Sequence, residues 1–331
     1  MTINVPTLDT LKTDGPAPHR RAALAFYPAL VGAGIVVRWL CRDHAASLPG
    51  WMPWEFRWGE FLATALVLWW YFCGVALSPP DERPSRLRQV VFVVGIMAIY
   101  AVLQTRYEYL AQHMFFFNRI QHLTMHHLGP FLIAMAWPGA SILRGMPAPL
   151  RRIADSRAVQ AVFAVVQQPV LAAVLFAGLI ALWLYPPVHF RAMLDLTLYD
   201  VMNWSMVIDG VLFWCLVLDP RRSPPARTSF GMRAAMVFVV IFPQIAMGAS
   251  IVFAKGDIYP VYDLCGRIYP GISAVYDQMV GGLIVWIPGS MMSLIGLLFL
   301  LNNLRRSEMM ETDNADEDPT AAFIDASSWT G

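Results

Sequence analysis

Residues 232–254 have the sequence MRAAMVFVVIFPQIAMGASIVFA, in which Arg233 is the only charged side chain. A run of roughly 20 apolar residues is long enough to cross the hydrocarbon core of a membrane as one α-helix. Seven more apolar runs of this kind lie near residues 22–40, 60–77, 89–104, 120–137, 159–185, 197–218 and 279–301. The sequence therefore predicts an all-α fold, a polytopic membrane bundle of about eight transmembrane helices.

The composition agrees with a chain that lies largely in lipid. Of the 331 residues, 57% are hydrophobic and only 14% are charged, and the mean hydropathy is +0.51. Soluble domains are about half apolar and about one quarter charged. The 24 basic and 23 acidic side chains leave a net charge of +1, so the charge does not favour a nucleic-acid partner. The composition predicts the lipid bilayer as a partner.

The apolar runs divide the chain into a cytoplasmic N-terminal segment (1–21), a transmembrane bundle (22–304) and an acidic cytoplasmic tail (305–331). The run at 22–40 follows Arg20 and Arg21 and has no A-x-A-like cleavage site close behind it, so we interpret it as a retained anchor. The tail after Arg306 has no Lys or Arg and no helical period, which is typical of disordered segments.

The basic residues indicate how the chain is oriented. With eight spans and the N-terminus inside, 16 of the 24 lysines and arginines fall on the cytoplasmic side and 8 on the outer side. This bias follows the positive-inside rule, and tryptophans cluster where the chain meets the outer interface. We therefore expect a multi-pass protein of a bacterial plasma membrane with both termini cytoplasmic. Cys41 and Cys265 are then both outside, so a disulfide is conceivable, although the spacing does not require one.

Polar side chains inside membrane spans are costly, so they mark candidate functional sites. Four of the seven histidines lie close together, at His113, His122, His126 and His127. On an α-helix Asn118, His122 and His126 share one face at i, i+4 and i+8, while His127 is turned away from it. The start of the run at 120–137 is therefore the first candidate for a binding site.

Three other spans carry polar or thioether groups at a similar depth. Imidazole and thioether ligands together favour copper, above all Cu(I), and carboxylates can orient such ligands. The predicted copper site has His122 and His126 as its foremost ligands, with these further members: His113, His127, Met206, Met247, Asp209 and Asp277. The alternative for the methionines is packing in the helix core, and the histidines would then bond one another or interfacial water.

Other functional classes have less support. A haem held by two histidines needs them on two facing helices, and the histidines that the sequence places inside the membrane all lie at the start of one run. No P-loop, G-x-S-x-G, H-E-x-x-H or kinase motif occurs, so we expect no enzymatic activity. A copper or proton transporter is an alternative, but it would need polar groups across the whole membrane, and here they collect in the outer half.

Three blocks of sequence resemble one known family: FFFNRIQHLTMHHLGPFLIAMAWPG at 115–139, IDGVLFWCLVLDP at 208–220 and YDQMVGGLIVWIPGSMM at 276–292. They are similar to the CtaG-type cytochrome c oxidase assembly factors, multi-span bacterial membrane proteins implicated in oxidase maturation and copper supply. The resemblance extends roughly from Trp51 to Asn302 and implies a seven-helix core preceded by an N-terminal anchor. It also implies oxidase subunits as partners and a periplasmic copper donor.

The chain departs from the family at two points. The family commonly has a His-Met-x-x-His pattern entering the fourth span, where this chain has Asn118, Arg119 and then His122. Many members also have histidines on the sixth span, where this chain has Tyr199 and Asn203. The resemblance implies an assembly factor for a haem–copper cytochrome c oxidase that assists copper delivery through the predicted cluster. The departures leave a metal-free scaffold for oxidase subunits as an alternative.

Overall fold

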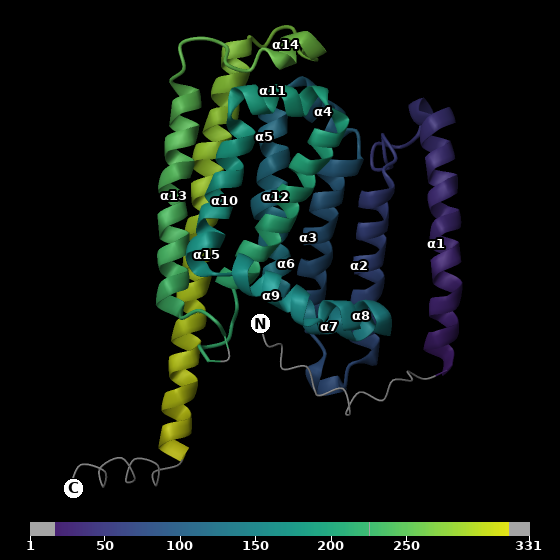
Figure 1. The fold of residues 1–331 in the computed structure, drawn as a ribbon, viewed down its shortest axis with the longest axis vertical. Helices are drawn as coiled ribbons and strands as arrows, with labels where there is room; N and C mark the ends of the chain where they lie inside the picture. Colours follow the sequence, from purple (N-terminus) through teal and green to yellow (C-terminus); the bar gives the residue numbers. More distant parts are fainter. Residues whose placement is uncertain (1–16, 225, 318–331) are drawn as a thin grey trace, which may run out of the picture.

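The computed structural model describes residues 17–224 and 226–317, and these residues form helices and no strand (Figure 1). Six of the helices are long and apolar enough to cross a membrane, and one bent pair is a seventh candidate. The six are α1 (Ala17–Asp43), α2 (Trp58–Leu77), α3 (Arg86–Gln104), α12 (Leu196–Val217), α13 (Phe230–Val252) and α15 (Ala274–Glu317). The prediction of a polytopic helical bundle is confirmed, with six or seven such spans in the described residues where the sequence predicted eight.

Short helices collect at the two ends of the bundle (Figure 1). One end, which we call the α14 end, carries α4 (Tyr107–His113), α11 (Pro186–Leu194) and α14 (Val261–Cys265). The opposite end, which we call the α7 end, carries α7 (Gly139–Gly145) and α8 (Ala148–Ala154). These short helices lie where a bundle that crosses a membrane meets water.

The predicted span at 120–137 is interrupted near its middle. It consists of α5 (Phe115–Leu123), the π-helical turn η3 (Thr124–Leu128) and α6 (Gly129–Ala136). Pro130 has no N–H with which to bond the carbonyl of His126, four residues earlier. The indole Nε1 of Trp214 donates to this oxygen instead, at 3.2 Å. π-helical turns are rare in proteins, and many of those that occur lie at functional sites.

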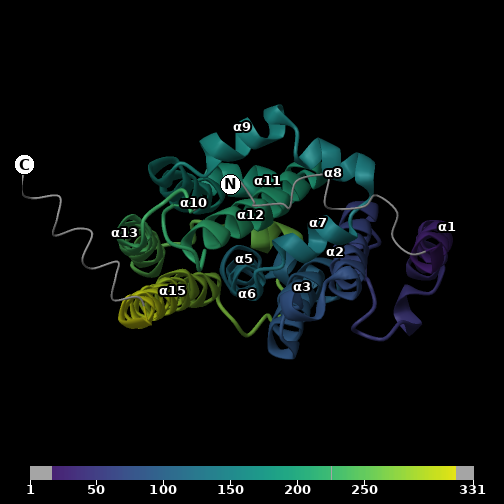
Figure 2. The same cartoon turned by 90° about the horizontal axis from the view of Figure 1, so that it is seen from below.

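The predicted span at 159–185 is divided as well. It consists of α9 (Arg157–Val166) and α10 (Pro169–Leu184), which are bent by 72°. Pro169 cannot donate to the preceding turn, and the side chain of Gln168 caps the new helix by accepting from the N–H of Leu171 at 2.7 Å. α10 therefore stands within the bundle, while α9 lies crosswise near the α7 end (Figures 1 and 2).

The first and last helices extend beyond the apolar runs that the sequence predicted. α1, the predicted anchor, lies at the edge of the bundle beside α2 (Figure 2), where the rings of Phe26 and Trp69 stack with centroids 3.8 Å apart. α15 continues as a helix to Glu317, which corrects the prediction of disorder for residues 305–317. This segment contains no proline or glycine that would end the helix. The rest of the predicted tail, 318–331, and the segment 1–16 lie outside the described residues.

α13 and α15 approach each other at backbone distance. A Cβ atom at Gly248 would come within 2.8 Å of the carbonyl oxygen of Gly282. Small residues of this kind let two membrane helices pack closely where no hydrophobic driving force exists between them. Together with α5, η3, α10 and α12, these two helices line a cavity.

Candidate functional site

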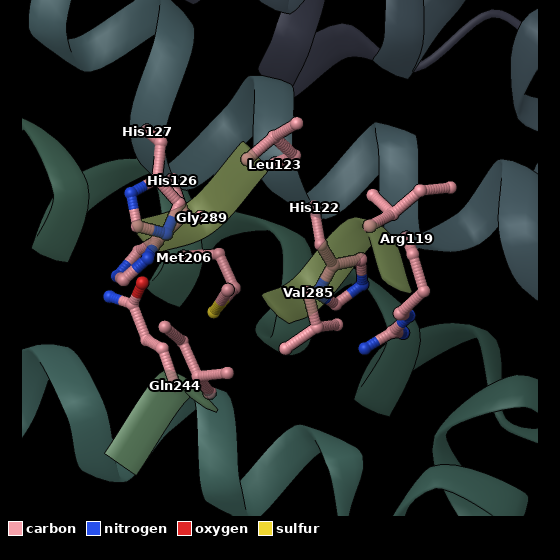
Figure 3. A pocket seen from close by; sticks show the side chains of 11 residues that line it. Arg119, His122, Leu123, His126, His127, Met206, Gln244, Val285 and Gly289 are labelled. Atoms are coloured by element: carbon pink, nitrogen blue, oxygen red, sulfur yellow. The ribbon is translucent and has the colours of Figure 1, made fainter. Parts of the chain in front are cut away.

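A cavity of about 30 Å³ lies inside the bundle (Figure 3). Its lining is apolar except for three imidazoles, a guanidinium, an amide and a thioether, which belong to His122, His126, His127, Arg119, Gln244 and Met206. In the view of Figure 3, His126, His127 and Gln244 project from one side and His122 and Arg119 from the other. The volume is sufficient for about two water molecules or one small ion.

The π-helical turn explains why both neighbouring histidines reach the cavity. The sequence predicted that His127 points away from the face of His126, because adjacent α-helical residues are separated by about 100°. In the structure η3 contains both residues, and both line the cavity. Their ring centroids are 5.1 Å apart and the rings meet edge to face. The predicted orientation of His127 is therefore corrected.

His126 is held in a fixed orientation by two neighbours. Its Nε2 lies 2.9 Å from Oδ2 of Asp209, and both side chains are buried. Its ring stacks on Phe176 with centroids 4.1 Å apart. Asp209, which the sequence predicted as an orienting carboxylate, thus contacts the histidine on the side away from the free Nδ1. This arrangement resembles the carboxylate–histidine pairs that fix metal-binding imidazoles.

Several polar atoms at the cavity have no hydrogen-bond partner within the described part of the chain. They include one nitrogen on each histidine, namely Nε2 of His122, Nδ1 of His126 and Nδ1 of His127, and both amide atoms of Gln244. A buried polar group without a partner costs about 1–3 kcal/mol. Unsatisfied groups gathered around one cavity therefore mark a place for water or a ligand.

The side chains at the cavity include ligand types that suit a soft metal ion, namely imidazole and thioether. No group of three or more His, Cys, Asp or Glu side chains within residues 17–224 and 226–317 is placed to hold a metal ion. The cavity offers imidazole nitrogens and the thioether of Met206. Imidazoles suit copper and thioethers select Cu(I), and Cu(I) accepts low coordination numbers.

Four of the predicted copper-site residues do not line the cavity: Asp209, which contacts the lining residue His126, and three that lie elsewhere. His113 lies on α4 at the α14 end, with its Nδ1 2.7 Å from the carbonyl oxygen of Tyr109. Met247 packs against a hydrophobic cluster that includes Met202 and Tyr262. Asp277 belongs to a separate network, which holds α5 and α15 together.

Asp277 caps a helix other than its own. Its two carboxylate oxygens accept from the backbone N–H groups of Phe115 and Phe116, at 3.0 and 2.8 Å, and it pairs with Arg267. Met114, the residue before α5, offers no side-chain cap to these N–H groups. Asp277, which the sequence predicted as a member of the copper site, therefore holds the start of α5 in place.

His189 is a buried histidine that the sequence interpretation missed. Its Nδ1 donates to the carbonyl oxygen of Trp183 at 3.0 Å, so its Nε2 accepts from the hydroxyl of Tyr262 at 2.9 Å. Burial, with a smaller effect from the charge of Arg119, lowers the pKa of His189 to about 3. The buried histidines are therefore not confined to the run at 120–137. A lone histidine between two apolar runs gives no pattern that would have revealed this.

An ionic network near the α14 end was also not predicted. Arg57 lies 2.8 Å from Oε1 of Glu108 and pairs with Asp200. Its guanidinium lies over the ring of Tyr199, 5.5 Å from the centroid, and the Tyr199 hydroxyl donates to Oε1 of Gln121 at 3.2 Å. Burial raises the pKa of Glu108 to about 8 against the opposing effect of Arg57. The network connects α2, α4 and α12 to α5 next to the cavity.

Comparison with known proteins agrees with the three sequence blocks. The model of the cytochrome c oxidase caa3 assembly factor family (Caa3_CtaG) matches residues 61–307. No curated protein and no solved structure matches the chain. The matched range covers most of the chain and contains every residue that lines the cavity. The predicted resemblance is confirmed, and this chain belongs to the family of cytochrome c oxidase caa3 assembly factors.

Proposed function

We propose that this assembly factor handles copper, as Cu(I), in its histidine-lined cavity while a haem–copper oxidase is assembled. Family membership supports the assembly role, and with it a membrane environment and contacts with oxidase subunits. The copper role rests on one observation: three imidazoles, each with an unpartnered nitrogen, and the Met206 thioether line the same cavity. Its own role in this process is that of a binding protein without catalysis.

The residues of the proposed copper site have different roles. His126, His127 and Met206 hold the ion, and Asp209 orients His126 and increases the electron density on its ring. His122 lies on the other side of the cavity in Figure 3, so the proposed site uses two histidines and Met206 and needs no third histidine. When bound, the metal ion is the cargo of the protein.

The proposed orientation places the α7 end in the cytoplasm of a bacterial cell. Arg144, Arg151 and Arg152 belong to the short helices at this end, as the positive-inside rule requires of a cytoplasmic face. The α14 end then faces the periplasm. A periplasmic copper donor would approach the protein from this side.

Copper content measured after loading tests the proposal. The detergent-purified protein is loaded with Cu(I) under reducing conditions, desalted and analysed for metal. We expect about one copper per chain, lost in the double variant His122→Ala/His126→Ala. His113→Ala is the matched control, because His113 lies on α4 outside the cavity, and it should retain the copper.

A metal-free scaffold is the second candidate. It is favoured by the lack of a three-residue His, Cys, Asp or Glu cluster in the described residues. Absence of copper from the wild-type protein would favour the scaffold and contradict the copper role. Equal copper in all three proteins would contradict the cavity as the copper site. Oxidase assembly in cells that carry the double variant distinguishes the two further, since a scaffold would still deliver an oxidase with its full copper content.

A further inference from the structure

Arg119 is a buried cation that has no anionic partner among the residues that the structure describes. Its side chain lies on α5 at the cavity, and the residue is only 2% exposed. It donates through Nη2 to Oδ1 of the neighbouring Asn118, and its guanidinium lies 4.9 Å from the ring centroid of Phe115. Its Nε has no hydrogen-bond partner, and no carboxylate of the described residues lies within ion-pair distance.

Two other arginines that are largely shielded from solvent each have several hydrogen-bond or ion-pair partners. Arg233 is fully buried and donates to the backbone carbonyl oxygens of three residues, namely Thr228, Asp219 and Arg221. Arg267 pairs with the carboxylates of Asp257, Asp263 and Asp277. Arg119 has a single side-chain amide in place of such a set.

The groups around Arg119 do not supply a negative charge. The hydroxyl of Tyr259 donates to the carbonyl oxygen of Leu184 at 2.7 Å, and that of Tyr262 donates to His189. Gly281, which packs on the aliphatic stem of Arg119, lies one turn from Asp277 on α15. The carboxylate of Asp277 already pairs with Arg267 and accepts from the backbone N–H of Phe115 at the start of α5.

An isolated charge inside a low-dielectric bundle is strongly unfavourable unless a counter-charge accompanies it. Arginine keeps its proton in proteins, so Arg119 cannot avoid the cost of a buried charge by becoming neutral. We propose that the cavity binds one small monovalent anion, of the size of chloride or bromide, against Arg119. The unpartnered Nε–H of Arg119 donates to the anion, and the ring of His122, whose Nε2 is also unpartnered, supplies a second N–H.

The size of the cavity selects the anion. About 30 Å³ is sufficient for a halide and too small for gluconate or a nucleotide. The proposal is independent of the copper role, since it concerns the protein without metal. It also gives the chain a property that the copper role lacks, namely a dependence of its stability on the anion in the buffer.

Thermal unfolding in two salts tests the proposal. The metal-free protein in detergent is exchanged into potassium gluconate, and bromide replaces gluconate at constant ionic strength. We expect the midpoint to rise saturably, by about 5 °C at a bromide concentration about 100 times the dissociation constant. Arg119→Gln should unfold at a midpoint that no longer responds to bromide, whereas Arg119→Lys keeps the charge and should respond partly.

Arg191→Gln is the matched control, because Arg191 is an exposed arginine on α11, outside the cavity. Its bromide response should equal that of the wild type. A wild-type midpoint that does not respond to bromide would overturn the proposal without any variant. A response of equal size in Arg119→Gln would overturn it as well, because the anion would then act elsewhere on the protein.

Discussion

The α14 end and the cavity contain the same kinds of polar side chain, but Arg267 and His189 at the α14 end are fully partnered, whereas Arg119 and the histidines at the cavity each have a nitrogen without a partner in the described residues. At the α14 end Arg267 pairs with three carboxylates and both nitrogens of His189 are bonded. At the cavity, within residues 17–224 and 226–317, Arg119 has no carboxylate partner and each histidine has an unpartnered nitrogen. Satisfied networks hold a fold together, whereas unsatisfied groups around a cavity are available for a ligand. Substitutions in the two regions should therefore affect different properties.

The largest effect on stability is expected at Asp277. Asp277→Ala leaves two N–H groups at the start of α5 without an acceptor and removes a buried partner of Arg267. We expect the free energy of unfolding to fall by about 3 kcal/mol. Unfolding in detergent measures the change.

Asp263→Ala is the control for this prediction. Its side chain is 57% exposed and pairs with the same arginine. We expect a loss of less than about 1 kcal/mol, as for other exposed pairs. Equal losses at Asp263 and Asp277 would contradict the structural role of Asp277.

His189 should make stability fall at acidic pH. Its pKa in the folded protein is about 3, below its ordinary value, so the unfolded chain binds a proton that the folded chain does not. Stability is therefore complete above the unfolded pKa and is lost as the pH falls below it, by about 2 kcal/mol between pH 7 and pH 5.

Comparison of the wild type with His189→Asn at both pH values isolates this contribution, because the other titrating groups are common to both proteins. The variant is expected to be less stable at pH 7 and to lose less stability on acidification. Parallel pH profiles would mean that His189 is not held neutral by the fold.

The smallest expected effect is on copper affinity. Asp209→Asn retains the shape of the side chain but weakens its interaction with His126. We expect Cu(I) binding to weaken by about tenfold, as other substitutions of orienting carboxylates do. Asp195→Asn is the control on the same helix, since Asp195 caps α12 by accepting from the N–H of Leu198 at 3.0 Å. An equal change in both variants would contradict the orienting role of Asp209.

The sequence predicted the helices well because the length of an apolar run has a direct physical meaning in a membrane. It did not predict the π-helical turn at 124–128, because an α-helical period was assumed through Pro130. The bond that accommodates the turn joins Trp214 to His126, residues far apart in the sequence. The division of 159–185 was also missed, although Pro169 lies within it.

The candidate site was predicted in part for a similar reason. The sequence marked His122 and His126 because histidines in a membrane span are unusual enough to indicate a site, and the structure brings them to one cavity with Met206. The role of Asp277 depends on its contact with α5, more than 160 residues earlier, which no local pattern encodes. Arg119 was missed because an arginine near the end of a span is ordinarily expected to extend to the membrane surface.

X-ray absorption at the copper edge of the Cu(I)-loaded protein tests most directly whether the cavity is the copper site. We expect imidazole nitrogen together with one sulfur in the coordination sphere, and loss of the sulfur in Met206→Leu. Met247→Leu, a methionine of α13 that does not line the cavity, should leave the spectrum unchanged. Copper bound only by nitrogen and oxygen, with a spectrum that Met206→Leu does not alter, would contradict copper binding in the cavity.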